Sequence, residues 1–123
     1  MNKRSNWEDF KSILEKNHIT TLYHFTDRDN LESIINNGGL YSWKDCEERG
    51  ITIAKPGGGG PGSASWMLDA RGGLEHYVRV SFTQQHPMMY VAMNEGRISN
   101  PVILEISPEV IYDEQTKYAD RNA

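Results

Sequence analysis

The sequence has little of the features that would place a protein in a membrane or outside the cell. No apolar run approaches the length needed to span a bilayer, and no apolar stretch follows the basic residues Lys3 and Arg4. The single cysteine, Cys46, cannot form an internal disulfide. We therefore expect neither a membrane span nor a signal peptide, and a reducing, cytoplasmic location is the simplest interpretation.

Clustered positive charge is also missing. The formal net charge is −4, and the basic residues are scattered, with only Lys3 and Arg4 adjacent. Because counterion release from clustered Lys and Arg supplies most non-specific affinity for nucleic acid, this composition disfavours such binding. A nucleic-acid partner would have to be recognised locally, or by protein outside this chain.

Familiar motifs for metals, phosphates and acyl transfer are absent. The histidines His18, His24, His76 and His86 are too dispersed to predict a metal site. The glycine run in residues 55–62 is followed by no Gly-Lys-Ser/Thr and opens no GxGxxG helix. No nucleophile-elbow sequence supports a Ser-His-Asp triad. None of these common chemistries is indicated.

What is present suffices for a single domain, residues 1–123, of α+β class with a small sheet of few strands. Apolar spacing predicts an amphipathic helix over 6–17, begun by a capping box of Ser5 and Glu8. It predicts a second helix over 27–37, with Leu31, Ile34 and Ile35 on its buried side and Gly38-Gly39 as its stop. A third helix is expected to begin at Pro87 and end at Gly96.

Strand signals are fewer than helix signals. Strands are predicted over 21–25, 77–82 and 102–106, with a short one over 51–53. Residues 41–50 are expected to form a loop or short helix, and 66–71 a helical turn closed by Gly72-Gly73. Residues 55–62 hold five glycines and two prolines, which predicts a flexible loop rather than a phosphate cradle.

A few polar residues are candidates for chemistry. His24 lies in a predicted strand and points away from Tyr23 and Phe25, so it can donate a hydrogen bond to a ribose hydroxyl or a diphosphate. The alternative, which spacing alone favours, is a core histidine satisfied by backbone. Arg71 precedes two glycines, an arrangement that can expose a guanidinium to a diphosphate. Tyr90 follows two methionines, a group that would normally be interpreted as core packing.

Taken together, blocks of residues from about position 20 to the end resemble the DarT family of DNA ADP-ribosyltransferase toxins. The blocks occur in the family's order and rough spacing. They are Leu22-Tyr23-His24-Phe25-Thr26, Asp29-Asn30-Leu31, Ile34-Ile35, Gly38-Gly39-Leu40, Gly72-Gly73-Leu74, His76-Tyr77-Val78, Ser81-Phe82, Pro87-Met88-Met89-Tyr90, Asn100-Pro101-Val102-Ile103-Leu104 and Asp120-Arg121-Asn122-Ala123.

The resemblance implies an ADP-ribosyltransferase fold in which NAD lies in a cleft between two small sheets. It places His24 at the nicotinamide ribose and Asn30 at the edge of the same pocket, and Thr26 and Tyr90 complete the implied cofactor-binding set. Arg71 is the best match to the arginine that the family uses in NAD binding and catalysis. No metal is implied.

The implied reaction moves ADP-ribose from NAD to a nucleobase of single-stranded DNA. A carboxylate stabilises the cationic sugar, and an unstacked base attacks it. The family's catalytic glutamate lies downstream of the Asp120–Ala123 block, so this chain is expected to be a truncated form, or half of a split enzyme, with little activity alone. A macrodomain antitoxin is implied as partner. The alternatives are a non-catalytic module that binds NAD or nucleic acid, and a transferase that acts on RNA or protein.

Overall fold

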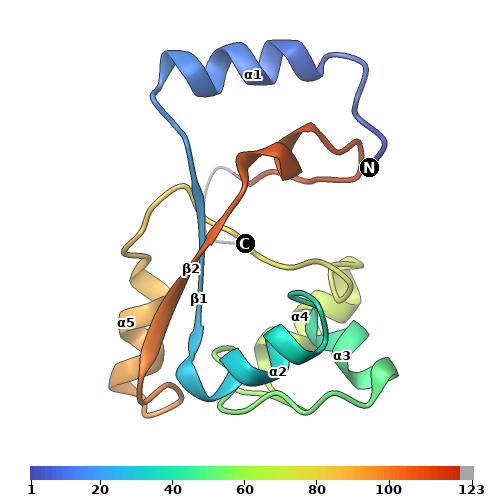
Figure 1. The fold of residues 1–123 in the computed structure, drawn as a ribbon. Helices are drawn as coiled ribbons and strands as arrows, with labels where there is room; N and C mark the ends of the chain where they lie inside the picture. Colours follow the sequence, from blue (N-terminus) through green and yellow to red (C-terminus); the bar gives the residue numbers. More distant parts are fainter. Residues whose placement is uncertain (120–123) are drawn as a thin grey trace.

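Two antiparallel strands form the regular sheet in the part of the chain that the structure describes, residues 1–119 of a computed structural model (Figure 1). Strand β1 (Leu22–Asp27) pairs with β2 (Pro101–Ile106) in a register that runs from Leu22 opposite Ile106 to Asp27 opposite Pro101. Both strands confirm predictions made for 21–25 and 102–106. Their mixture with helices confirms the α+β class.

A buried carboxylate joins the end of β1 to the residues that precede β2. The side chain of Asp27 is fully buried and accepts backbone N–H bonds from Asp29 at 3.0 Å, Ser99 at 2.9 Å and Asn100 at 3.2 Å. These bonds lower the pKa of Asp27, with the one from Asp29 contributing most, against the opposing effect of burial. The carboxylate therefore fixes where the two strands meet.

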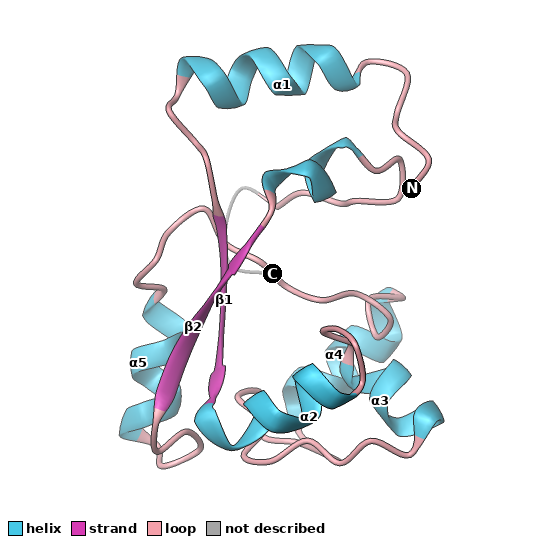
Figure 2. Ribbon diagram, in the orientation of Figure 1, coloured by secondary structure: helices cyan, strands magenta, loops and turns pink. Residues whose placement is uncertain are grey.

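Helices lie on both sides of the strands (Figures 1 and 2). In this view α5 flanks one side, while α2, α3 and α4 gather on the other and α1 lies beyond one end of the sheet. Their bounds are α1 (Trp7–Lys16), α2 (Leu31–Asn36), α3 (Trp43–Arg49), α4 (Ala64–Gly72) and α5 (Pro87–Asn94), with 3-10 turns η1 (Arg28–Asn30) and η2 (Pro108–Tyr112).

The helix ends follow from single residues. Pro87 opens α5, and the His86 imidazole accepts a hydrogen bond from the Met88 backbone N–H. Left-handed glycines end α3 at Gly50 (φ 71°) and α4 at Gly73 (φ 71°), where a side chain would be strained. These boundaries confirm the predicted helix over 87–93 and the glycine stop after 66–71, and they extend that turn into a full helix.

The best-packed core lies between α1, η2 and one end of the sheet. It is made of Leu14, Leu22, Ile111 and Tyr112, and partly buried side chains of α1 and its neighbours surround it. The amphipathic pattern of 6–17 predicted this use of α1. Its predicted start is wrong: the helix is capped at Asn6, without a side-chain bond, and no Ser5–Glu8 capping box forms.

Two strand predictions are wrong. Residues 77–82 lie beside β1 but share a single bridge with it, in which Tyr23 and Ser81 exchange backbone bonds of 2.9 and 2.8 Å. The carbonyl of Arg79 is occupied by a histidine side chain instead of a strand amide. Residues 51–53 also form no strand, because the Ile51 amide donates to Cys46 at the end of α3.

The second helix is shorter and more exposed than its pattern predicts. The 3-10 turn η1 takes its first residues, so that α2 begins only at Leu31. Leu31 and Ile34 are partly buried, but Ile35 is 75% exposed, so its predicted burial is wrong.

Residues 55–62 contain turns but neither helix nor strand, and their predicted flexibility stays a prediction. The Asp120-Arg121-Asn122-Ala123 block lies outside the described residues. Within residues 1–119, each helix is too short or too polar to cross a lipid bilayer.

Replacing the buried carboxylate of Asp27 by an amide tests its role in joining the strands. In Asp27→Asn, the side-chain amide N–H would face backbone N–H groups that now donate to the carboxylate. We therefore expect the melting temperature at neutral pH to fall by about 5–10 °C. Because the folded-state pKa is lowered, the carboxylate stabilises the fold above pH 3.8 and loses this effect as the pH falls through the folded value. The gap between the two proteins should therefore close in acid.

Thermal melts followed by circular dichroism over a pH series would measure this difference. Glu32→Gln, a matched change of an exposed carboxylate on α2, is the control and should melt like the parent protein. Equal melting of the Asp27 variant and the parent protein at neutral pH would contradict the role given to Asp27.

Candidate functional site

Strand β1 carries two of the residues singled out in the sequence on one face. His24 and Thr26 are two positions apart, so their side chains point to the same side of the sheet, while Tyr23 and Phe25 point to the other. Their partners across the sheet are Leu104 and Val102. The period of the strand thus places His24 and Thr26 together on one face of the sheet.

The imidazole of His24 is held by the backbone of the neighbouring segment. Its Nδ1 lies 2.6 Å from the carbonyl oxygen of Arg79, which can only accept, so Nδ1 carries the proton. Burial lowers the pKa of His24, and the bond to Arg79 only partly offsets this. The ring is therefore neutral near pH 7, and Nε2 is its hydrogen-bond acceptor.

Arg79 is itself fixed by a buried carboxylate. Its guanidinium makes a two-pronged contact with Asp69 of α4, at 3.0 and 2.5 Å, and the indole N–H of Trp43 donates to the same carboxylate at 3.0 Å. Burial alone would raise the pKa of Asp69, but the bonds from Arg79 and Trp43 outweigh it and lower the pKa. Asp69 thus links α3 and α4 to the segment that holds His24.

Asn30 links β1 to the start of the glycine-rich loop. Its amide makes a paired contact with Ala54, donating to the carbonyl and accepting from the N–H at 2.7 Å each, and it also donates to the Thr26 hydroxyl at 3.1 Å. The side chain is buried. Asn30 therefore shapes the region next to Thr26 by holding the loop, with its polar atoms already engaged.

The remaining sequence candidates are not brought to this group. Arg71 is exposed near the end of α4, and within residues 1–119 it makes no hydrogen bond or ion pair. Tyr90 is 44% exposed on α5. The structure thus assembles His24, Thr26 and Asn30 around β1, and leaves Arg71 and Tyr90 on separate helices.

Arg79 is the residue that sequence reasoning missed. It lies within the strand predicted over 77–82, and nothing in its spacing points to Asp69. The available signal was an arginine within an otherwise apolar segment, close after the acidic residue of a helix. That signal identifies a pair only once the fold is known.

Trp43 also lines a hollow of about 370 Å³. Trp43 and Trp66 stack in it, with ring centroids 4.4 Å apart and planes inclined by 9°. The other residues lining it are Glu47, Ile51, Thr52, Ile53, Pro56 and Pro61. The stacked tryptophans join α3 to α4, the two helices that fix Asp69.

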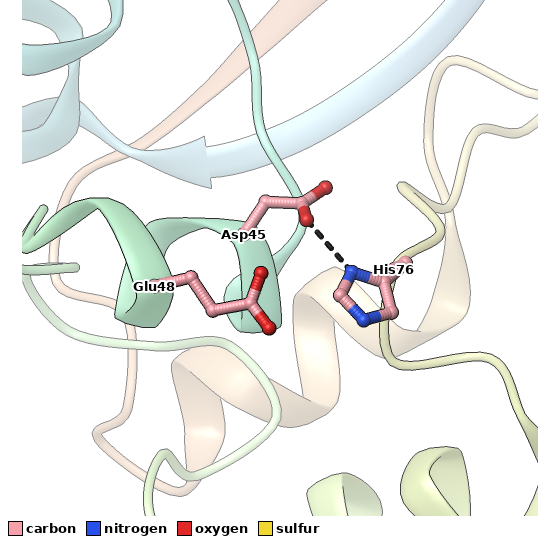
Figure 3. A group of neighbouring side chains, drawn as sticks. All are labelled: Asp45, Glu48 and His76. Atoms are coloured by element: carbon pink, nitrogen blue, oxygen red, sulfur yellow. Dashed lines mark hydrogen bonds and ion pairs between the residues drawn. The ribbon is translucent and has the colours of Figure 1, made fainter.

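A second polar group contains a histidine that the sequence did not connect with any partner. His76 Nδ1 lies 2.7 Å from a carboxylate oxygen of Asp45, and Glu48 is one turn further along α3 (Figure 3). The three side chains each offer one atom within 4.8 Å of the others. The hydrogen bond to Asp45 raises the pKa of His76, and the same bond lowers the pKa of Asp45.

The paired contact between Asn30 and Ala54 gives a test of the local structure. Asn30→Asp keeps the shape of the side chain but puts a second acceptor against the Ala54 carbonyl. We expect a loss of about 1–3 kcal/mol in the free energy of unfolding, measured by urea denaturation at neutral pH. Asn36→Asp, the same change at an exposed position of α2, should cost far less. Similar losses in both variants would contradict the role given to the contact between Asn30 and Ala54.

Comparison with known proteins places these residues in a family. A family model described as ssDNA thymidine ADP-ribosyltransferase, DarT, matches residues 23–123. No curated protein and no solved structure gives a significant match. The matched region contains β2, all of β1 except Leu22, and the whole group around His24. The chain therefore belongs to the DarT family of single-stranded-DNA ADP-ribosyltransferases.

Proposed function

We propose that this chain binds NAD at the His24 face of β1, for transfer of ADP-ribose to a base of single-stranded DNA. The observation that carries the proposal is the fixed, neutral imidazole of His24, whose Nδ1 is bound to the Arg79 carbonyl. Family membership supports the reaction class and the nucleic-acid acceptor. The site, the donor and the roles of single residues are the parts that we add.

The tautomer of His24 defines how it would meet the nucleotide. Since Nδ1–H donates to Arg79, the unprotonated Nε2 can accept a hydrogen bond from a ribose hydroxyl. This reverses the direction expected from the sequence, in which the histidine donates. The Thr26 hydroxyl, on the same face, accepts from Asn30 and keeps its own proton to donate. The two side chains therefore fit a ribose.

We assign charge compensation to Arg71. Its guanidinium is exposed and has no acidic partner in residues 1–119, whereas Arg79 is neutralised by Asp69. An arginine fork binds a diphosphate by two parallel bonds. We propose that Arg71 meets the NAD diphosphate and that the exposed ring of Tyr90 contributes to the same cofactor-binding set.

In the proposed reaction the bond between nicotinamide and the ribose breaks, and nicotinamide leaves with the electron pair. A base nitrogen or oxygen then bonds to the ribose carbon and loses its proton to a nearby group. The cationic sugar needs a carboxylate close by. Glu105 is opposite Tyr23 in the sheet, so it points to the face opposite His24. Glu109 lies in η2 and lines a hollow beside α1.

These positions lead us to propose that the chain supplies the donor pocket and that the catalytic glutamate comes from other polypeptide. The same positions favour a second candidate, a non-catalytic module that binds NAD or nucleic acid. Because the chain resembles a family of toxins, we also propose that it acts as a toxin in the cytoplasm. Its partner would be a macrodomain antitoxin that removes ADP-ribose. RNA and protein are the competing acceptors.

Removing Nε2 of His24 while keeping the bond to Arg79 tests the donor site. In His24→Asn, the amide can still donate to the carbonyl but offers nothing in place of Nε2. We expect the affinity for NAD, measured by isothermal titration calorimetry, to fall about threefold to tenfold, as for one lost hydrogen bond. His18→Asn is the control, because His18 is exposed and lies before β1. Equal affinities in the two variants would remove His24 from the site.

Transfer is measured in the same proteins with labelled NAD and single-stranded oligonucleotides that each carry one kind of base. The proposal expects label on DNA when the rest of the polypeptide is present, and little from the chain alone. Label on RNA or protein would overturn the choice of acceptor. NAD binding with no transfer in any form would favour the non-catalytic module.

The neutral state of His24 predicts a pH dependence. Below its ordinary pKa of 6.5 the folded protein still keeps the ring neutral, because burial lowers the pKa. Protonation at lower pH would convert Nε2 from acceptor to donor and weaken the bond to the ribose. We expect NAD affinity to be constant above pH 6.5 and to decline at a pH below it. The decline should be absent in His24→Asn, and an equal decline in both proteins would assign it to another group.

A further inference from the structure

A hollow of about 330 Å³ lies between α1 and η2, away from the residues proposed for NAD. We call it the α1–η2 hollow, and Figure 1 shows these two elements side by side beyond the end of β2. Its lining consists of Lys3, Trp7, Lys11, Ser107, Pro108, Glu109 and Tyr112. The function proposed above uses none of these side chains for NAD.

The fold brings together two lysines that are eight positions apart in the sequence. Lys11 lies one turn after Trp7 on α1, so the two side chains share a face of the helix. Lys3 comes from the segment before the helix, and its ammonium lies 3.9 Å from the centre of the Trp7 ring and 5.7 Å from that of Tyr112. The hollow is thus locally basic in a chain whose net charge is −4.

The segment that carries Lys3 is held in place by backbone bonds. The Arg4 N–H donates to the Tyr112 carbonyl at 2.8 Å, and Lys3 forms a bridge with Asp113. The Arg4 guanidinium donates to the carbonyls of Asp113 and Thr116 at 2.9 and 2.8 Å. Although it is near the chain start, Lys3 is therefore positioned relative to η2.

The ring of Trp7 lines the hollow, with the Lys3 ammonium against it. It is partly exposed, whereas Tyr112 is buried behind it, with ring centroids 5.3 Å apart. Grooves for single-stranded nucleic acid combine such aromatic faces with lysines that contact the phosphates. Glu109 of η2 also lines the hollow, and its carboxylate repels phosphates. The sugar-phosphate backbone of a bound strand would therefore follow α1.

We propose that the α1–η2 hollow binds a segment of single-stranded DNA, with a base stacked on Trp7 and phosphates at Lys3 and Lys11. The proposal rests on the proposed function, because it supplies the acceptor strand with a second contact outside the NAD site. Duplex DNA does not fit, since its base faces are covered by neighbouring pairs. The family match begins at residue 23, so Lys3, Trp7 and Lys11 are a feature of this chain beyond the matched region.

Charge reversal on α1 tests the proposal without any need for NAD. Binding of a fluorescently labelled short oligothymidine is measured by anisotropy with the full chain at low salt. Lys11→Glu should weaken binding about tenfold and make the salt dependence less steep, by about 0.7 in the slope of log K against log salt for the lost phosphate contact. The matched control is Lys16→Glu, the same reversal at an exposed position on α1 outside the hollow.

Stacking is tested separately by Trp7→Leu, which keeps apolar packing against the core but removes the flat ring. We expect a loss of about tenfold in affinity, with a salt slope equal to that of the parent protein. Circular dichroism melts establish that the variant is folded. If Trp7→Leu fails to fold, the parent protein still provides the readout: bound oligothymidine must quench its tryptophan fluorescence, and duplex DNA must not.

Several results would overturn the proposal: equal weakening by Lys11→Glu and Lys16→Glu, duplex binding as tight as single-strand binding, or tighter binding of the matching RNA. The outcome is separable from that of the NAD site. If Lys11→Glu loses DNA binding and no protein shows transfer, the DNA-binding site is supported and the transferase function is overturned. If Lys11→Glu transfers ADP-ribose with an unchanged KM for DNA, the transferase function is supported and the DNA-binding site is overturned.

Discussion

The rest of the structure depends on one buried charge, the carboxylate of Asp27. Three backbone amides bind it, one from the turn after β1 and two from the residues before β2. A buried charge is tolerated only where such donors surround it, so the two segments cannot slide past each other. Since a shift by one residue would turn every side chain of a strand to the other face, this contact also decides which face carries His24 and Thr26.

A second buried carboxylate, that of Asp69, orients His24 through the side chain and backbone of Arg79. Asp69 binds the Arg79 side chain, and the Arg79 carbonyl in turn accepts from the imidazole. The nitrogen that remains available to a ligand is therefore set by α3 and α4, which do not touch it. Such outer partners commonly fix the tautomer of functional histidines. In this family member, the helices act on the site through the backbone of a non-helical segment.

Local signals in the sequence predicted much of the fold, because they act over a few residues. Pro87 and the glycine at 73 set helix boundaries by their own backbone preferences, and residues of high strand propensity identified β1 and β2. The segment 77–82 has the alternation of a strand, but its hydrogen bonds are decided by distant groups. The ion pair of Asp69 with Arg79 depends equally on tertiary structure. So does the placement of Lys3 and Lys11 around the same hollow as Trp7. His24, Thr26 and Asn30 were named from the family resemblance, and they lie together because they are close in the chain; their roles stay a proposal.

The contact of Asn30 with Ala54 has a consequence for how the glycine-rich loop can vary. A further bond, from Arg97 Nε to the Gly57 carbonyl at 2.8 Å, attaches the loop three residues later. The first half of the loop is thereby anchored at two points, and residues 58–62 follow the second of them. Insertions or deletions are best accommodated in residues 58–62, where changes in length leave both anchor points and the neighbouring β1 edge undisturbed.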